Sequence, residues 1–150
     1  MLGDIYSDNK KALYDYEILE KFEAGLVLIG QEVKSIKMGQ INLAGSYVII
    51  RVNQPELVGA KVPAYQPKNA PADYNPERSR KLLLNKKEID YLLGKSASRG
   101  LTIIPIKVYN KNNRIKIEVA VVRKLKKHDK RESIKKRETD REVRREYKRG

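Results

Sequence analysis

The sequence predicts a small, mainly β protein with short helices, in which a closed antiparallel barrel is followed by a basic tail. Three observations predict it. Several short segments alternate apolar with polar residues or are rich in β-branched residues, few segments have helical spacing, and residues 123–150 hold 14 Lys and Arg against 6 Asp and Glu. About 120 residues are enough for one domain with a core. We therefore expect a barrel domain over residues 1–122 and a tail over residues 123–150.

The first half of the chain reads as strand, helix and hairpin. Residues 14–22 alternate large apolar with polar side chains, which predicts a strand with one wet face, interrupted by Glu23-Ala24-Gly25. Gly30 to Met38 places Val33 and Ile36 on one face and precedes Gly39, as expected of a short helix. Residues 46–52 and 57–65 are predicted to pair as a hairpin around Asn53-Gln54-Pro55.

The second half contains a loop, the best helix and the clearest hairpin. Residues 66–78 include three prolines and little apolar bulk, so we expect an exposed loop with no core segment. Asn85 and Glu88 have the spacing of a capping box and predict a helix that ends near Gly94. Residues 101–109 and 114–122 are strands joined by four polar residues. Five or six strands with one or two helices favour an oligonucleotide-binding (OB) type barrel.

Charge points to RNA as the partner. The chain has a formal net charge of +14, of which the tail supplies 14 − 6 = +8 and residues 1–122 supply 19 − 13 = +6. Polyanions favour such surfaces because binding releases condensed counterions, so we expect strong salt sensitivity. A membrane surface would also attract the charge, but the tail has no apolar face suited to insertion. The tail contains no Pro, and no Gly before its last residue, so nothing in it forbids a helix.

Catalytic chemistry has little support in these residues. There is no Cys, and the single His lies in the tail, which leaves no scaffold for a Cys or multi-His metal site or a His-based triad. Acidic pairs such as Glu17 with Glu20 have no metal-ligand spacing. No secretory signal or membrane-length apolar run is found. We expect a protein that is not an enzyme, uses no cofactor and no metal, and acts in the cytoplasm, as a monomer.

Basic clusters and tyrosines are the candidate RNA contacts that the residues themselves suggest. Lys10-Lys11 and Arg78-Ser79-Arg80-Lys81 could contact phosphate. The chain has nine Tyr, one Phe and no Trp, and tyrosine can stack on unpaired bases. Tyr14 or Tyr16, beside the first cluster, is the better candidate for stacking, whereas Tyr47 and Tyr109 fit strand patterns and are expected to be structural.

Several strings, in a fixed order along nearly the whole chain, resemble the small protein B (SsrA-binding protein) family of bacterial trans-translation. Glu-Val-Lys-Ser after a strand, Lys-Leu-Leu-Leu before a helix and Asp-Lys-Arg before a basic tail form a specific combination. The strings are Asn9-Lys10-Lys11-Ala12, Phe22-Glu23-Ala24-Gly25-Leu26, Gly30-Gln31-Glu32-Val33-Lys34-Ser35-Ile36, Ser46-Tyr47-Val48, Arg80-Lys81-Leu82-Leu83-Leu84 and Asp129-Lys130-Arg131.

The resemblance implies an OB-type barrel that binds the tRNA-like domain of transfer-messenger RNA (tmRNA, SsrA) and delivers it to stalled ribosomes. It implies RNA contacts at the positions of Asn9, Glu23 and Leu83. For Leu83 to pack against a base, only one of Leu82, Leu83 and Leu84 need face outward; otherwise Leu83 is expected to be core beside the helix. Partners by family likeness are the ribosome (the rRNA of its decoding centre and the empty mRNA channel) and, indirectly, alanyl-tRNA synthetase and elongation factor Tu. With the basic clusters, the predicted RNA-binding set is Asn9, Lys10, Lys11, Tyr16, Glu23, Lys34, Arg80, Lys81 and Leu83.

The tail is expected to stand in for codon–anticodon pairing in the empty message channel. Glu132 with Lys136, and Asp140 with Arg144, are helical pairs worth only about 0.2 to 0.5 kcal/mol each. We therefore predict a tail that is disordered when free and helical when bound. Its predicted ribosome-binding residues are Lys126, Lys127, His128, Asp129, Lys130, Arg131, Lys135 and Lys136. Where the family usually has Gly-Lys-Lys, this chain has Lys124-Leu125-Lys126, which predicts a stiffer join between body and tail.

Two other functions are compatible with parts of the sequence. A general RNA-binding or ribosomal barrel protein would fit the charge and fold, and would bind unrelated structured RNAs with similar affinity. A metal-dependent nuclease using body carboxylates would cleave RNA when a divalent cation is added. Selectivity among RNAs separates the first from the family function, and cleavage separates the second.

Overall fold

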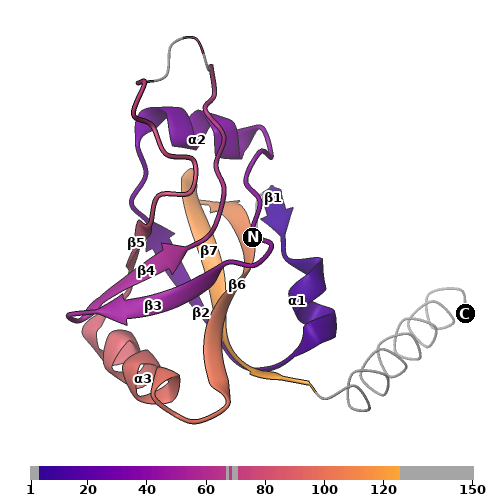
Figure 1. Cartoon of the computed structure of the whole chain (residues 1–150), viewed down its shortest axis with the longest axis vertical. Helices are drawn as coiled ribbons and strands as arrows, with labels where there is room; N and C mark the ends of the chain where they lie inside the picture. Colours follow the sequence, from indigo (N-terminus) through magenta and orange to yellow (C-terminus); the bar gives the residue numbers. More distant parts are fainter. Residues whose placement is uncertain (1–3, 67, 69–70, 126–150) are drawn as a thin grey trace, which may run out of the picture.

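The computed structural model describes residues 4–66, 68 and 71–125, and the calls on the tail from residue 126 onward lie outside them. In this part the chain forms one seven-stranded sheet in the order β1-β6-β7-β2-β5-β4-β3, with every neighbouring pair antiparallel. The sheet curls around the core, with α1, α2 and α3 at different places on its margin (Figure 1). The mainly β fold with short helices is therefore confirmed.

Two N-terminal elements were not predicted. Strand β1 (Ile5–Asp8) pairs with β6, and helix α1 (Lys10–Asp15) follows at once. Strand β2 (Tyr16–Leu26) then runs through the segment expected to interrupt it, and pairs with β7 from Tyr16 to Gly25. A glycine inside a strand often marks a place where a neighbouring group approaches closely, and Leu83 lies against Gly25 here.

Helix α2 (Gly30–Lys37) is confirmed, and its hairpin neighbour is shorter than expected. Strands β3 (Tyr47–Arg51) and β4 (Gln54–Val58) pair in register around Val52 and Asn53, which both have positive φ. Positive φ at both central residues is the signature of a two-residue hairpin turn. The turn therefore lies one residue earlier than the predicted Asn53-Gln54-Pro55.

Strand β5 (Arg80–Leu83) joins the two parts of the sheet and was missed, because four residues carry too little pattern. Helix α3 (Lys86–Ser96) begins at the predicted cap, where Asn85 accepts from the Glu88 N–H at 2.8 Å. Strands β6 (Leu101–Lys111) and β7 (Arg114–Lys124) form the predicted hairpin. Strand β7 runs to Lys124, two residues past the predicted end at Val122.

The core lies inside the curled sheet, and a smaller apolar cluster lies under α1. The main cluster includes Ile36, Leu57, Leu82 and Leu92, and the second joins Ala12 to residues of β6 and β7. The second cluster packs α1 against the sheet face that does not look into the main core. It fixes the helix that carries several predicted RNA contacts.

The expectation of a closed barrel is wrong for the described strands. No hydrogen-bonded pairing joins β3 to β6 there, and a cavity of about 320 Å³ lined by residues of both strands and by Ser96 separates them. The C-terminal half of β6 pairs with β1 instead. The N-terminal half of β6 faces β3 across that cavity without pairing, so the hydrogen-bond ladder of the described strands does not close. No helix in the described residues is long and apolar enough to cross a membrane.

Candidate nucleic-acid interface

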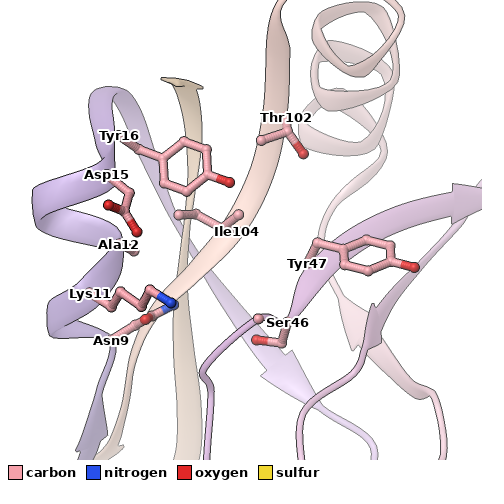
Figure 2. Close-up of a pocket in the computed structure, with 10 residues that line it drawn as sticks. Asn9, Lys11, Ala12, Asp15, Tyr16, Ser46, Tyr47, Thr102 and Ile104 are labelled. Carbon is pink, nitrogen blue, oxygen red and sulfur yellow. The ribbon is translucent and has the colours of Figure 1, made fainter. Parts of the chain in front are cut away.

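A cavity of about 300 Å³ brings together three predicted RNA contacts. Asn9, Lys11 and Tyr16 line it from α1 and its two flanks, and Ser46 and Tyr47 line it from the start of β3. Figure 2 shows these groups on opposite sides, with Ile104 of β6 between them. Lys10 is exposed at the start of α1 but does not line the cavity.

Asn9 anchors this corner to β6. Its side-chain amide donates to the Pro105 carbonyl at 2.9 Å and its backbone N–H donates to the Ile106 carbonyl at 2.7 Å. The residue is buried. A buried amide bonded to backbone carbonyls holds the start of α1 in place, so Asn9 has a structural task whether or not its oxygen also meets RNA.

The cavity combines a cation with aromatic rings. The Lys11 ammonium extends from α1 toward β6, and the Tyr16 ring lies beside Ile104 (Figure 2). Tyr47 was expected to be structural, but 44% of it is exposed, which corrects that expectation. Asp15 also lines the cavity, so Lys11 shares it with a carboxylate. A cation and two tyrosines around one hollow are suited to a phosphate and an unpaired base.

A second group of predicted contacts lies on the outer face of β2 and β5. Gly25 pairs with Leu83, and a Cβ added at Gly25 would lie only 3.2 Å from the Leu83 Cβ. The Leu83 side chain therefore covers the glycine while 60% of the residue stays exposed. Leu82 is buried and Leu84 packs against the core, so only Leu83 of the three faces outward, as predicted. Lys81 is exposed on the same side of β5.

Glu23 carries a charge that two neighbours stabilise. Its carboxylate accepts a hydrogen bond from the Tyr109 hydroxyl and bonds from the Lys111 ammonium at 3.1 and 3.2 Å. The bond from Tyr109, followed by the bond and charge of Lys111, outweighs burial and holds the pKa of Glu23 below its ordinary value of 4.5. Burial, and then Glu23, raise the pKa of Tyr109. Tyr109 is buried, as expected.

Arg80 is not available to RNA, which corrects its place in the predicted set. The side chain is buried, and its Nε and Nη2 donate to Oε2 of Glu32 at 2.9 and 2.6 Å. The strand alternation of β5 turns Arg80 and Leu82 inward. In the sequence, the Arg-Ser-Arg-Lys cluster gave no sign of this, because the acid that pairs with Arg80 lies 48 residues away.

Lys34 lies apart from both groups, on α2. Its ammonium is 5.6 Å from the centre of the Tyr65 ring. Tyr65 and Tyr47 are the aromatic residues that sequence reasoning did not select. Their only signal in the sequence was a polar neighbour, Gln66 for Tyr65 and Ser46 for Tyr47, which is too common to be decisive. The predicted tail residues lie outside the described part of the chain.

Metal chemistry finds no scaffold in the described part of the chain. No group of three or more His, Cys, Asp or Glu side chains that could hold a metal ion occurs among residues 4–66, 68 and 71–125. Several acidic side chains there pair with cations, as Glu118 does with Lys21 at 3.6 Å and Glu77 does with Lys61 at 3.3 Å.

A curled antiparallel sheet with cations and tyrosines around its hollows, in a chain of net charge +14, has the features of a small basic RNA-binding protein. The comparisons with known proteins are more specific. The family model described as SmpB protein matches residues 6–149. The chain belongs to the SmpB protein family.

Relatives match over nearly the full length. The chain is 48% identical over 145 residues to the SsrA-binding protein of Oleidesulfovibrio alaskensis, covering 96% of this chain and 92% of that one. It is 44% identical over 148 residues to the SsrA-binding protein of Sulfurihydrogenibium sp., covering 99% and 97%. A solved structure described as "tmRNA-SmpB: a journey to the center of the bacterial ribosome" matches with a TM-score of 0.67 and 36% identity, covering 85% of this chain and 93% of the other.

Proposed function

We propose that this protein binds the tRNA-like domain of transfer-messenger RNA and delivers it to stalled ribosomes for rescue and peptide tagging. Membership of the SmpB family supports the proposal, as do relatives named for SsrA binding and a similar structure described with tmRNA on the bacterial ribosome. One structural observation carries it further. Three residues chosen from the sequence, Asn9, Lys11 and Tyr16, line one cavity.

The described residues offer two kinds of contact for that RNA. At the cavity, the Lys11 ammonium would neutralise a phosphate while Tyr16 or Tyr47 stacks on an unpaired base. On the outer face of β2 and β5, the exposed Leu83 would pack against a base. Glu23 would accept from a ribose hydroxyl, since an ionised carboxylate has about four acceptor positions and its protein partners leave room.

The tail completes the proposal on the ribosome. We infer that the part of the predicted tail that follows β7, residues 125–150, occupies the empty mRNA channel near the decoding centre, where rRNA neutralises its cations. Pairs such as Glu132 with Lys136 then support a helix that the isolated tail could not hold, because each pair contributes only about 0.2 to 0.5 kcal/mol. The barrel-like body and the tail thus divide the work. Alanyl-tRNA synthetase and elongation factor Tu would act on the same RNA in the cytoplasm, with one copy of this chain bound as a monomer.

A titration tests the proposal. The full-length protein is titrated against transfer-messenger RNA and against an unrelated tRNA at near-physiological salt. We expect a clear preference for transfer-messenger RNA, because a family function predicts selective recognition. Equal affinity for the two RNAs would contradict the proposal and favour a general RNA-binding protein. Divalent-dependent cleavage of either RNA would instead favour the nuclease reading.

A further inference from the structure

A buried carboxylate fixes the loop between β4 and β5. Glu32 lies on α2 with no exposed surface, and three residues donate hydrogen bonds to its carboxylate. Arg80 donates to its Oε2 at 2.9 and 2.6 Å, Arg78 donates to both oxygens, the Tyr74 hydroxyl lies 3.3 Å from Oε2, and the Ile29 N–H donates to Oε1 at 3.0 Å. Burial raises the pKa of Glu32, but these bonds and the charge of Arg80 outweigh it, so the net shift is downward.

The same cluster holds both limbs of the loop. Arg80 also donates to the Ala60 carbonyl at 2.8 Å on the outgoing limb and to the Pro76 carbonyl at 2.9 Å on the returning limb. The Tyr74 hydroxyl donates to the Val62 carbonyl at 2.7 Å, and the Val62 N–H donates to Pro76 at 2.9 Å. A proline-rich loop predicted to be merely exposed is therefore anchored at its base on α2.

The anchored loop presents an aromatic ring beside a cation. Lys34, two residues after Glu32, points outward from the same helix, and its ammonium lies 5.6 Å from the Tyr65 ring centre. The two residues line a cavity of about 390 Å³ with Gln31 and Gln66. The described residues that line it include one cation and no carboxylate. Figure 1 places α2 and this loop at the end of the molecule away from α3.

This arrangement matches the chemistry of one nucleotide. An ammonium pairs with a phosphate, an aromatic face stacks on a base of any identity, and the amide of Gln31 offers donors and an acceptor to a base edge or a ribose. An acidic peptide would use the cation but would leave the ring without a planar partner. In a chain of net charge +14, RNA is the polyanion that fits both groups.

We propose that Lys34 and Tyr65 form a contact for one unpaired nucleotide of the bound RNA, and that Glu32 is the positioning residue that holds the ring there. The inference rests on the proposed function, since it takes RNA as the ligand. It adds Tyr65, Glu32 and Arg78 to the residues on which RNA binding depends. Glu32 does not touch the nucleotide but acts through the loop.

A single tryptophan reports this contact directly, because the chain contains none. Tyr65→Trp keeps a stacking surface, and we expect transfer-messenger RNA to quench its fluorescence at saturation. The matched control is Tyr91→Trp on α3, where Lys95 lies 5.5 Å from the ring in the same kind of pair. We expect little quenching there. Equal quenching at the two positions, or none at residue 65 while the RNA binds, would overturn the proposal.

Affinity and salt dependence separate the two contacts. Tyr65→Ala should weaken binding by roughly 5- to 150-fold without changing the salt slope, because stacking releases no counterion. Lys34→Ala should reduce the slope of log affinity against log salt by about 0.7 to 0.9, the value for one phosphate. Lys95→Ala serves as the control and should change neither quantity. A Lys34→Ala slope equal to that of the control would refute the phosphate contact.

The role of Glu32 is tested in the Tyr65→Trp protein. Glu32→Gln should lower the fluorescence anisotropy of the free protein and reduce the quenching by RNA, because the loop loses its charged anchor. If that variant does not fold, Arg78→Met is used instead, because the Arg78 side chain is 32% exposed and its loss removes only one of the residues that donate to Glu32. We expect Arg78→Met to reduce the quenching and Arg78→Lys to restore part of it. Unchanged anisotropy and quenching in the folded variant would exclude the positioning role.

The controls keep the two hypotheses apart. If wild-type protein binds transfer-messenger RNA no better than tRNA, the proposed function fails. The nucleotide contact is then judged by the difference in quenching between residues 65 and 91 on either RNA. If wild-type protein is selective and the two tryptophans respond alike, only the contact fails.

Discussion

Arg80 and Glu32 form an ion pair from which water is excluded. The guanidinium of Arg80 and the carboxylate of Glu32 are both buried, with donor to acceptor distances of 2.9 and 2.6 Å. The pair joins α2 to the start of β5, which are far apart in the sequence. Residues that read as surface in the sequence are therefore part of the interior, and this changes what their substitution should do.

The first prediction concerns stability. Arg80→Met leaves the Glu32 carboxylate buried with fewer partners, so we expect the free energy of unfolding to fall by about 3 to 5 kcal/mol. Lys61→Ala removes an exposed pair with Glu77 and should cost about 0 to 1 kcal/mol. Urea denaturation of both variants measures the difference. Similar small losses in the two variants would show that Arg80 is not held as described.

The second prediction concerns pH. Because the pKa values of Glu32 and Glu23 are lowered in the folded protein, the stability that they contribute is present above their unfolded value of about 4.5 and is lost as pH falls through their folded values. We expect unfolding free energy to fall below about pH 4.5 and to fall less steeply in Glu23→Gln. Denaturation at several pH values between 6 and 3 measures both slopes. Equal slopes for wild type and Glu23→Gln would contradict the lowered pKa of Glu23.

The third prediction concerns the contact between Gly25 and Leu83. A Cβ at Gly25 would lie 3.2 Å from the Leu83 Cβ, so Gly25→Ala should displace Leu83. Crowding costs about 1 to 3 kcal/mol and is offset by about 0.5 to 1 kcal/mol of strand preference, which leaves a net loss of roughly 1 kcal/mol. Because Leu83 is a proposed RNA contact, its displacement in Gly25→Ala should also lower the affinity for RNA. Gly94→Ala on α3 meets no atom within 4 Å and should stabilise the protein by about 0.5 to 1 kcal/mol. A stabilised Gly25→Ala protein would refute the crowding.

The fourth prediction separates two adjacent leucines. Leu83 is exposed, so Leu83→Ala should change the free energy of unfolding by less than about 0.5 kcal/mol and still weaken RNA binding. Leu82 is buried, and Leu82→Ala should cost about 2 to 5 kcal/mol. Denaturation and RNA titration are run on both proteins. If Leu83→Ala bound RNA as well as wild type, the outer face of β2 and β5 would not be an RNA contact.

The fifth prediction separates body and tail. Replacing Asp129, Lys130 and Arg131 by Ala in the full chain should leave affinity for free transfer-messenger RNA within a factor of about two, and should impair tagging on stalled ribosomes. The reason is that the proposed RNA contacts of the body lie in residues 4–125, whereas the tail is proposed to meet the ribosome. Titration and an in vitro tagging assay measure the two steps. Equal losses in both assays would contradict the proposal that the body binds transfer-messenger RNA and the tail binds the ribosome.

Sequence patterns predicted secondary structure correctly where interactions between residues close in the sequence decide it. The cap at Asn85, the β6–β7 hairpin and α2 were all predicted, because hydrogen bonds and side-chain periodicity within a few residues decide them. Short elements such as β1 and β5 were missed, since four residues carry too little pattern. Their strand conformation depends on neighbours that lie far away in the sequence.

In the candidate site, too, some features could be predicted from the sequence and others depended on contacts between residues far apart in the chain. From the sequence we could predict the SmpB resemblance, the basic character and the outward position of one leucine among three, since these depend on residue identity and order. The tertiary structure alone decided that Arg80 turns inward while Tyr47 and Tyr65 face outward, and that the sheet curls without closing. The physical reason is distance along the chain. A cation such as Arg80 can be buried only if an opposite charge pairs with it, and the carboxylate that does so lies 48 residues away in the sequence.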